Sequence, residues 1–470
     1  MHHPVKVYAR RGIGKLAPIT KLDGARPSLL RESAFATLLM AAGLLVTVPP
    51  HASAQSRPTY VQFSPSAVKG ALYAPDSGPA PHVAILRMHR TSNVMGSLAC
   101  IELSKRGFLV LCMNPRFDNN EAEVRWEDIA LDVRSGVAFL RRQPGVTRVL
   151  LWGHSGGGPT MSFYQAVAET GPSYCQGPNK LVECGNDLAG LPPADGLILV
   201  DAHPGNSVNG LRSLNGAVTN DAAIVGENQP PRIDPELDPF NPQNGYNPTG
   251  PSTYPDVFAT RYFAAQAARM NSLIDLARSR LQAMEHGTAR YPDDDAFLVV
   301  KGNGARLLEA DLRLHHGTVR PQKLLKNDGT VVTQIVESVR RPDLRLAQQN
   351  ATFNGGTRFL TVRSFLSANA IRATDSMEGT DWCSSNNSVP CALRSIAVPL
   401  LVVAMGAHYF IRDNEIHFEV ARSTDKDFIT IEGASHGQTP CTACERTPGQ
   451  YSNAATNFFD YVRDWINARY

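Results

Sequence analysis

Residues 149–157 read Val-Leu-Leu-Trp-Gly-His-Ser-Gly-Gly, and a helix-compatible stretch follows at residues 159–169. The four apolar residues predict a buried strand, so the Gly-x-Ser-x-Gly pattern around Ser155 falls on a sharp turn between a strand and a helix. A serine on such a turn needs a strained backbone, and small neighbours let the strand and the helix close on each other. The Ser155 hydroxyl is then held at the end of a sheet, beside a helix N-terminus that favours negative charge.

Short apolar strands and helix-like segments alternate on both sides of this turn. We expect further strands at residues 83–86, 108–111, 197–200, 399–404 and 427–431, and further helices at residues 93–105, 126–142, 415–422 and 453–468. Such alternation predicts an α/β fold with a mostly parallel sheet and helices on both faces.

The alternation is interrupted after Asp201 by residues 203–391, which are rich in Asn, Pro and Gly. We expect this range to be an inserted cap that divides a catalytic core into residues 55–202 and 392–470. Within it, residues 257–285 predict a helix and residues 296–300, 319–339 and 359–362 predict strands. Asn327-Asp328-Gly329 marks a hairpin turn inside the second of these β-like ranges.

The first 54 residues have the features of a targeting segment. A leader with seven basic residues, the last of them Arg31, precedes an apolar run at residues 35–48, and Ala52-Ser53-Ala54 matches a small-residue cleavage site. The apolar run is shorter than the roughly 20 residues that a bilayer span requires. We therefore predict cleavage near Ala54, a mature chain that begins at Gln55, no stable membrane span, and a secreted or periplasmic protein.

The charge balance gives no sign of nucleic-acid binding. The chain of 470 residues has a formal net charge of +3, but the first 54 residues hold seven of its 46 basic and two of its 43 acidic residues, which leaves the remainder at −2. No basic patch interleaved with aromatic residues is present. We expect no nucleic-acid partner.

All eight cysteines lie after the predicted leader, and an even number suits an exported protein. Three pairs are close in sequence and lie in polar, loop-like surroundings, which predicts short-loop disulfides. These pairs are Cys175/Cys184, Cys383/Cys391 and Cys441/Cys444. Cys100 and Cys112 lie in apolar runs and are expected to be buried thiols, with pairing between them as the alternative.

A serine nucleophile needs a base, and the best candidate is His436 in Gly433-Ala434-Ser435-His436-Gly437. This loop directly follows the last predicted strand, so parallel strands would bring His436 to the same edge of the sheet as Ser155. His408 and His417 flank a different strand end and are weaker candidates.

The strand–turn–helix motif at Ser155 and the late histidine give the chain a resemblance to the α/β-hydrolase superfamily, in its serine esterase and lipase branch. The resemblance covers residues 60–202 and 398–470. It implies an α/β-hydrolase fold with an oxyanion hole made by two backbone N–H groups, those of Gly156 and Arg90. His89, beside Arg90, is expected to be a packed turn residue.

The acid that should orient His436 is not determined by the pattern. Relatives often place an aspartate three residues after the glycine that ends the penultimate strand, but that position here is Tyr409. Three carboxylates remain as alternatives: Asp413, Glu415 and Asp201. The first two belong to the loop and helix after that strand, where helix-terminal charge is the competing role. Asp201 ends the strand that precedes the insertion.

The expected function is that of a secreted serine hydrolase that cleaves carboxylic esters, small or polymeric, through an acyl-enzyme on Ser155. No cofactor or metal is implied. An amidase or peptidase, or a cofactor-free lyase or perhydrolase, would use the same residues. A non-catalytic binding protein that retains the fold is the alternative from another class.

Overall fold

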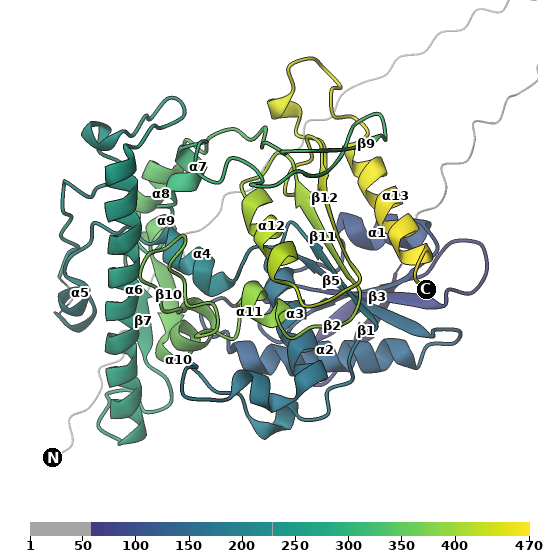
Figure 1. Ribbon diagram of the computed structural model, residues 1–470. Helices are drawn as coiled ribbons and strands as arrows, with labels where there is room; N and C mark the ends of the chain where they lie inside the picture. Colours follow the sequence, from purple (N-terminus) through teal and green to yellow (C-terminus); the bar gives the residue numbers. More distant parts are fainter. Residues whose placement is uncertain (1–57, 228) are drawn as a thin grey trace, which may run out of the picture. The chain divides into compact units, whose positions relative to one another are not determined.

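The computed structural model describes residues 58–227 and 229–470, and the predicted targeting segment lies outside the described residues. The described strands form a ten-stranded sheet and a two-stranded sheet (Figure 1). The larger sheet contains β1 (Thr59–Gln62), β2 (Lys69–Tyr73), β3 (Val83–Met88), β4 (Leu109–Asn114), β5 (Arg148–His154), β6 (Gly196–Val200), β8 (Gln322–Leu325), β9 (Val331–Gln334), β11 (Leu400–Met405) and β12 (Lys426–Ile431).

The larger sheet has the order β1-β2-β4-β3-β5-β6-β11-β12-β8-β9. In this spatial order, the seven adjacent strands that begin with β4 and end with β8 all pair in parallel. Strands β1, β2 and β9 pair antiparallel at the two edges of the sheet. The central strands are buried on both faces, as helix-covered parallel sheets require. The mostly parallel α/β fold expected from the sequence is therefore confirmed.

Helices cover both faces of this sheet. The helices packed against it are α1 (Leu98–Lys105), α2 (Trp126–Arg141), α3 (Gly157–Thr170), α11 (Val389–Leu393), α12 (Ile411–Val420) and α13 (Ala454–Asn467). Apolar residues of α2, α3, α11 and α12 join one core cluster, and those of α1 and α13 join the other. Helix α2 illustrates the cause, because Ile129, Val133 and Val137 recur at helical spacing and are fully buried. Helix α1 begins at Leu98 rather than at residue 93, because Ser97 before it has an extended backbone.

The predicted insertion contributes a second group of elements. They are α4 (Asn206–Ser213), α5 (Asp221–Glu227), α6 (Asp256–Glu285), β7 (Ala296–Val299), α7 (Leu307–Ala310), α8 (Leu346–Ala351), α9 (Phe353–Gly356), β10 (Arg358–Thr361) and α10 (Val362–Ser364). Strands β7 and β10 form the small antiparallel sheet. Figure 1 shows the long helix α6 beside them, on the side away from α13.

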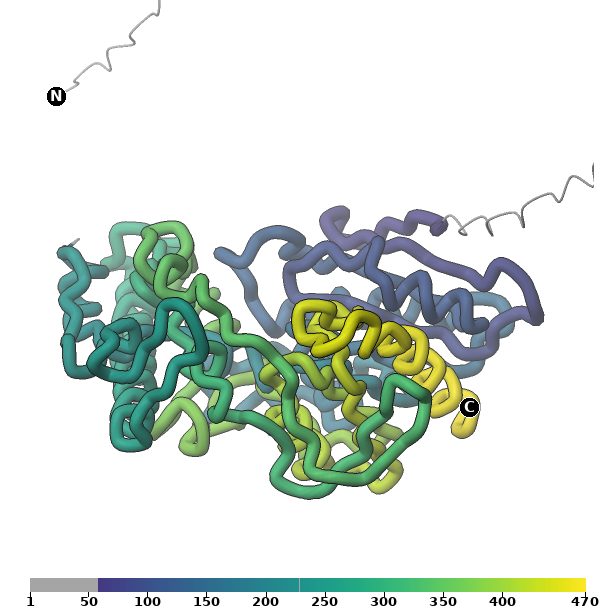
Figure 2. Tube along the Cα trace, turned by 90° about the horizontal axis from the view of Figure 1, so that it is seen from above, coloured from purple at the N-terminus to yellow at the C-terminus, as the bar shows by residue number. Residues whose placement is uncertain are grey.

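The range 203–391 is not wholly separate from the core. The hairpin of β8 and β9, with Gly329 in the left-handed region of its turn, pairs with β12 and extends the larger sheet. Figure 2 shows this green segment reaching toward the yellow C-terminal part, while most of the inserted range lies to one side. The β-like pattern at residues 319–339 therefore correctly predicted a hairpin, but it did not indicate that this hairpin pairs with β12.

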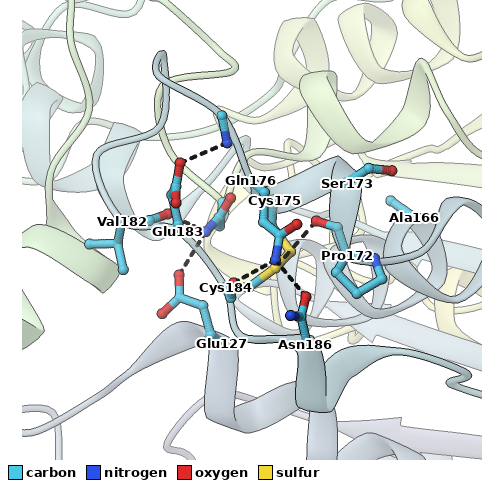
Figure 3. Close-up of a disulfide and its surroundings, with 12 residues drawn as sticks. Glu127, Ala166, Pro172, Ser173, Cys175, Gln176, Val182, Glu183, Cys184 and Asn186 are labelled. Atoms are coloured by element: carbon cyan, nitrogen blue, oxygen red, sulfur yellow. Dashed lines mark hydrogen bonds between the residues drawn. A yellow bond between two sulfur atoms is a disulfide. The ribbon is translucent and has the colours of Figure 1, made fainter.

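Four disulfides are present among the described residues, and no free cysteine is found there. The three predicted short-loop pairs are confirmed. Figure 3 shows the pair Cys175–Cys184, which closes the loop after α3 while Gln176 donates hydrogen bonds to the Cys184 carbonyl and to Asn186.

The expectation that Cys100 and Cys112 are buried thiols is wrong, because they form the fourth disulfide. Cys100 lies on α1, which packs on the face of β4 toward which Cys112 points, and their Cα atoms are 6.3 Å apart. The sequence correctly placed both residues in the core but could not indicate that this helix covers this strand.

No helix among the described residues combines the length and the apolar character that crossing a membrane would need.

Candidate active site

Ser155 lies in the turn between β5 and α3, with a backbone φ of 54°. A non-glycine residue is uncommon in this left-handed region, and such strain concentrates at functional sites. The turn is fixed on both sides, because the Ser155 N–H donates to the Val200 carbonyl and its own carbonyl accepts from the Gly158 N–H. The sequence prediction of a sharp strand-to-helix turn is thus confirmed.

The glycines around Ser155 are required by close backbone approach. A methyl group on Gly153 would lie 2.7 Å from the Gly158 Cα atom, and one on Gly157 would lie 2.5 Å from the Met88 carbonyl oxygen. A methyl group on Gly158 would meet the Ala202 Cβ atom at 2.4 Å. Strands β5, β3 and β6 and helix α3 can therefore approach this closely only because positions 153, 157 and 158 carry no side chain.

Ser155, His436 and Asp201 form one hydrogen-bonded chain. The Nε2 atom of His436 lies 2.9 Å from Ser155 Oγ, and its Nδ1 atom lies 2.6 Å from Asp201 Oδ2. These residues follow β5, β12 and β6 respectively, at the carboxyl ends of parallel strands. An oxygen nucleophile, an imidazole and a carboxylate in this order form the arrangement that nucleophilic acyl transfer needs.

Asp201 is the carboxylate that contacts His436, whereas the other two alternatives, Asp413 and Glu415, contact other groups. Both oxygens of Asp413 accept from Arg212 Nη1 at 3.0 Å.

Glu415 accepts hydrogen bonds from the backbone N–H groups of Val319 and Arg320, and also pairs with Arg412. The buried Asp413 and Glu415 on α12 thus anchor the inserted region to the core.

Electrostatics favour an ionised Asp201. Complete burial alone would raise the pKa of this carboxyl, but the imidazoles of His408 and His436 outweigh burial and hold the pKa well below its usual range. The Met405 backbone N–H also donates to Asp201 Oδ1. The carboxylate therefore stays negative and can stabilise a positive charge on His436.

His408 is a second imidazole at Asp201 that the sequence analysis set aside. Its Nδ1 atom lies 2.8 Å from Asp201 Oδ2, although the angle does not satisfy a hydrogen bond, and its ring stacks on His436 with centroids 4.3 Å apart. Burial, opposed by the Asp201 charge, lowers the pKa of His408. The only sequence signal for this residue was its position just after the end of β11.

The loop that carries His436 is held by the residue that precedes the nucleophile. His154 Nε2 lies 2.8 Å from the His436 carbonyl oxygen, so it donates there, and His154 Nδ1 then accepts from Arg87 Nη2 at 3.3 Å. Burial, with His436 and Arg87 nearby, holds the pKa of His154 well below its usual range, consistent with a neutral ring. His154, the variable residue before Ser155 in the Gly-x-Ser-x-Gly pattern, thus positions the His436 loop, which the pattern itself does not indicate.

Polar groups converge on Gly156, on the side where an oxyanion would form. Within the described residues, neither the Gly156 nor the Arg90 backbone N–H donates to a protein acceptor. A methyl group on Gly156 would lie 2.4 Å from both His89 Nε2 and Arg90 Nη1. His89 Nδ1 accepts from the N–H groups of Thr91 and Ser92, as a packed turn residue should. The assignment of Gly156 and Arg90 as oxyanion donors stays a prediction.

One group of described residues has the spacing to hold a metal ion. Ligand atoms of Asp201, His408 and His436 lie within 4.8 Å of one another. Two of these residues are already engaged with Ser155 or with each other, so an ion there would compete with proton transfer. The prediction that no metal or cofactor is needed remains a prediction.

His417, a buried histidine close to Asp413, predicts that the protein loses stability in mild acid. His417 on α12 is fully buried, and neither ring nitrogen has a protein partner among the described residues. Burial, partly opposed by Asp413, lowers the pKa of His417 to about 4, against about 6.5 in an unfolded chain. The unfolded state then binds more protons between these values, so stability falls as pH drops through this window, by about 2 kcal/mol at pH 5 for this group.

Urea unfolding at pH 7 and pH 5 checks this expectation. His417→Phe should lose less stability between the two pH values than the wild type, while the exposed His316→Asn should change this difference little. His315, whose pKa burial also lowers to about 4, should retain part of the slope. An unchanged slope in His417→Phe would show that this histidine is not held neutral.

These features together define the class of fold. A parallel sheet with β2 antiparallel at its edge, helices on both faces, and a strained serine between β5 and α3 are the features of the α/β-hydrolase fold. The fold expected from the sequence is confirmed.

Comparison with solved structures finds matches that include two esterases and DcsB. Est1E from Butyrivibrio proteoclasticus is 10% identical with a TM-score of 0.34, over 88% of this chain and 98% of that one. The esterase domain of a Rhodothermus marinus protein is 12% identical with a TM-score of 0.34, over 88% and 99%. DcsB, in complex with its substrate analogue, is 12% identical with a TM-score of 0.40, over 87% and 98%. No protein-family model matches the chain, and no curated protein matches its sequence significantly.

Proposed function

We propose that this protein is a serine hydrolase that cleaves carboxylic esters through an acyl-enzyme on Ser155. The observation that carries the proposal is the hydrogen-bonded chain from Ser155 Oγ through His436 to the buried Asp201. The left-handed backbone at Ser155 supports it, because strain of this kind is kept where a hydroxyl must be presented to a substrate.

In the proposed mechanism, Ser155 Oγ attacks the ester carbonyl while His436 Nε2 takes its proton. The proton then passes from His436 to the leaving alcohol as the carbon–oxygen bond breaks. A water molecule, deprotonated by His436, attacks the acyl-enzyme, and the proton returns to Ser155 Oγ as the acid leaves. Asp201 holds the Nδ1–H of His436 and stabilises the imidazolium that forms in each half of the reaction.

The negative oxygen of each tetrahedral intermediate is proposed to lie near the backbone N–H groups of Gly156 and Arg90. Each such donor can lower the barrier by about 3 kcal/mol. Two observations support this placement: these N–H groups have no acceptor in the described part of the chain, and the positive end of α3 lies here.

We also propose that the protein is exported, secreted or periplasmic, after cleavage near Ala54. Four disulfides support this location, because disulfides persist in oxidising compartments.

Labelling with a fluorophosphonate probe tests the proposal, using protein that begins at Gln55. Wild-type protein should be labelled and should turn over p-nitrophenyl esters, and Ser155→Ala should lose both. Ser162→Ala is the matched control, because Ser162 is a buried serine on α3 whose hydroxyl has no partner among the described residues, and it should keep both. Folded wild-type protein that is not labelled would overturn the serine mechanism. Labelling without turnover of any ester would contradict ester hydrolysis and favour an amide, lyase or perhydrolase reaction.

A further inference from the structure

A cleft of about 550 Å³ lies between loops that follow β3 and β4 and elements of the inserted range. Its volume falls in the range of small-molecule sites. Its polar lining consists mainly of guanidinium and amide groups, which include Arg90, Arg306, Arg358, Asn206, Asn209 and Asn369.

Arg90 connects the cleft with the turn that carries the proposed catalytic serine. This residue belongs to the cleft lining, and its Nη1 atom would lie 2.4 Å from a methyl group built on Gly156, the residue after Ser155. The Arg90 side chain therefore lies between Gly156 and the rest of the cleft lining, within reach of a substrate group that extends past Gly156.

The positive charges in this lining exceed the negative ones. Three arginines line the cleft, and Glu121 is the single carboxylate among its lining residues. Glu121 pairs with Arg90 at 2.9 Å and is half exposed at 51% of its side chain. Arg306 pairs with Glu309, which lies outside the lining, at 3.1 Å.

Arg358 has no carboxylate partner among the described residues. Its Nε atom donates to the Gly302 carbonyl at 2.9 Å, and its Nη1 atom donates to Asn369 Oδ1 at 3.2 Å. The Nη2 group donates to no acceptor in the described part of the chain. Burial, with Arg306 and Arg90 close by, lowers the pKa of Arg358 to about 10, so the group stays positive at neutral pH.

Asn209 adds an amide whose side chain makes no hydrogen bond with the described residues. Its Oδ1 atom is buried without a hydrogen-bond partner in the described residues, and no hydrogen bond from its Nδ2 group is found there either. A carboxylate accepts hydrogen bonds, so it could pair with the Nδ2 group of Asn209 but not with Oδ1, which is itself an acceptor.

Resting on the hydrolase function proposed above, we propose that this cleft selects esters that carry a carboxylate, which binds Arg358 and Arg90 beyond Gly156. A planar guanidinium matches a carboxylate with two parallel hydrogen bonds, and charge-assisted bonds of this kind are stronger than neutral ones. A neutral ester of the same length would leave Arg358 without a counter-ion.

The test compares matched esters at low and high salt. In the acyl series, p-nitrophenyl hemiadipate is compared with p-nitrophenyl heptanoate; in the alcohol series, 4-carboxyphenyl butyrate is compared with 4-carbamoylphenyl butyrate. Wild-type kcat/KM should be at least about tenfold higher for the carboxylate member of one series, and this preference should shrink as salt screens the charges. Equal rates for both members of both series would overturn the proposal.

Variants in the cleft should move this preference in opposite directions. Arg358→Gln should lower kcat/KM about tenfold or more for the carboxylate ester and leave the neutral ester nearly unchanged, which also shows that the variant is folded. Glu121→Gln removes the one carboxylate in the lining and should raise the preference a few-fold. Arg261→Gln, on the exposed side of α6, is the matched control and should change neither rate. Equal loss for both esters in Arg358→Gln would assign Arg358 a structural role only.

Binding to Ser155→Ala separates this proposal from the proposed reaction. Calorimetric titration with adipate and with inorganic phosphate should show adipate binding that Arg358→Gln weakens, with phosphate binding more weakly. If the wild type hydrolyses no ester but adipate still binds in this way, the proposed function fails and the cleft assignment stands. Binding of phosphate alone would overturn a carboxylate site.

Discussion

Replacing His436 with alanine is expected to lower kcat for ester hydrolysis by about a million-fold, comparable with loss of the histidine in a well-studied serine protease. The reason is that, among the described residues, His436 Nε2 is the basic nitrogen within hydrogen-bond distance of Ser155 Oγ. Without it, the hydroxyl has no acceptor for its proton and remains a weak nucleophile. Stopped or continuous p-nitrophenyl ester assays, with Ser155→Ala as the background, measure the loss.

His408→Ala is the variant to compare with His436→Ala. Both imidazoles lie against Asp201, but of the two only His436 contacts Ser155. We expect His408→Ala to cost about 10- to 100-fold, the equivalent of one charge-assisted contact. A larger loss in His408→Ala than in His436→Ala would assign the base to His408 and contradict the proposed mechanism.

Asp201→Asn is expected to lower kcat about ten thousand-fold with little change in fold, as the loss of the orienting carboxylate does in other triads. An amide in place of the carboxylate cannot stabilise the His436 imidazolium, and it can donate to Nδ1, which selects the wrong tautomer. Kinetics over pH 5–9, with folding verified by circular dichroism, provide the measurement.

The matched controls for Asp201→Asn are Asp413→Asn and Glu415→Gln, because the sequence alone left all three carboxylates as candidates for the acid. Both should keep kcat within about threefold per folded molecule, because neither carboxylate contacts His436. Asp413→Asn should instead lower stability by about 3–5 kcal/mol, since it leaves the buried Arg212 without its partner. A loss of kcat in either control as large as that in Asp201→Asn would contradict the assignment of the acid.

The local parts of the candidate site could be predicted because their causes are local in sequence. A serine between small residues, after an apolar run and before a helical one, predicts its own turn, and the structure has that turn at Ser155. His436 could be placed because it follows the last strand, and parallel strands end at a common edge.

The acid and the second histidine could not be chosen in the same way. Asp201, Asp413 and Glu415 all follow strands that end at this edge, so their distances in sequence do not rank them. The choice depends on the strand order, in which β6 lies beside β5 and next to β11, and on helix α12, which turns Asp413 and Glu415 toward the inserted region.

The sequence by itself determined the α/β class, the strained turn at Ser155, the histidine after the last strand and three of the four disulfides. Each of these depends on side chains a few residues apart, where backbone sterics, hydrophobic periodicity and short loop closure decide the outcome. Only the tertiary structure decided which carboxylate meets His436, that Cys100 pairs with Cys112, that β8 joins β12, and that three arginines share one cleft beside Gly156. These contacts join segments from distant parts of the chain, and they form because packing of the sheet and its helices, rather than any local pattern, sets which segments become neighbours.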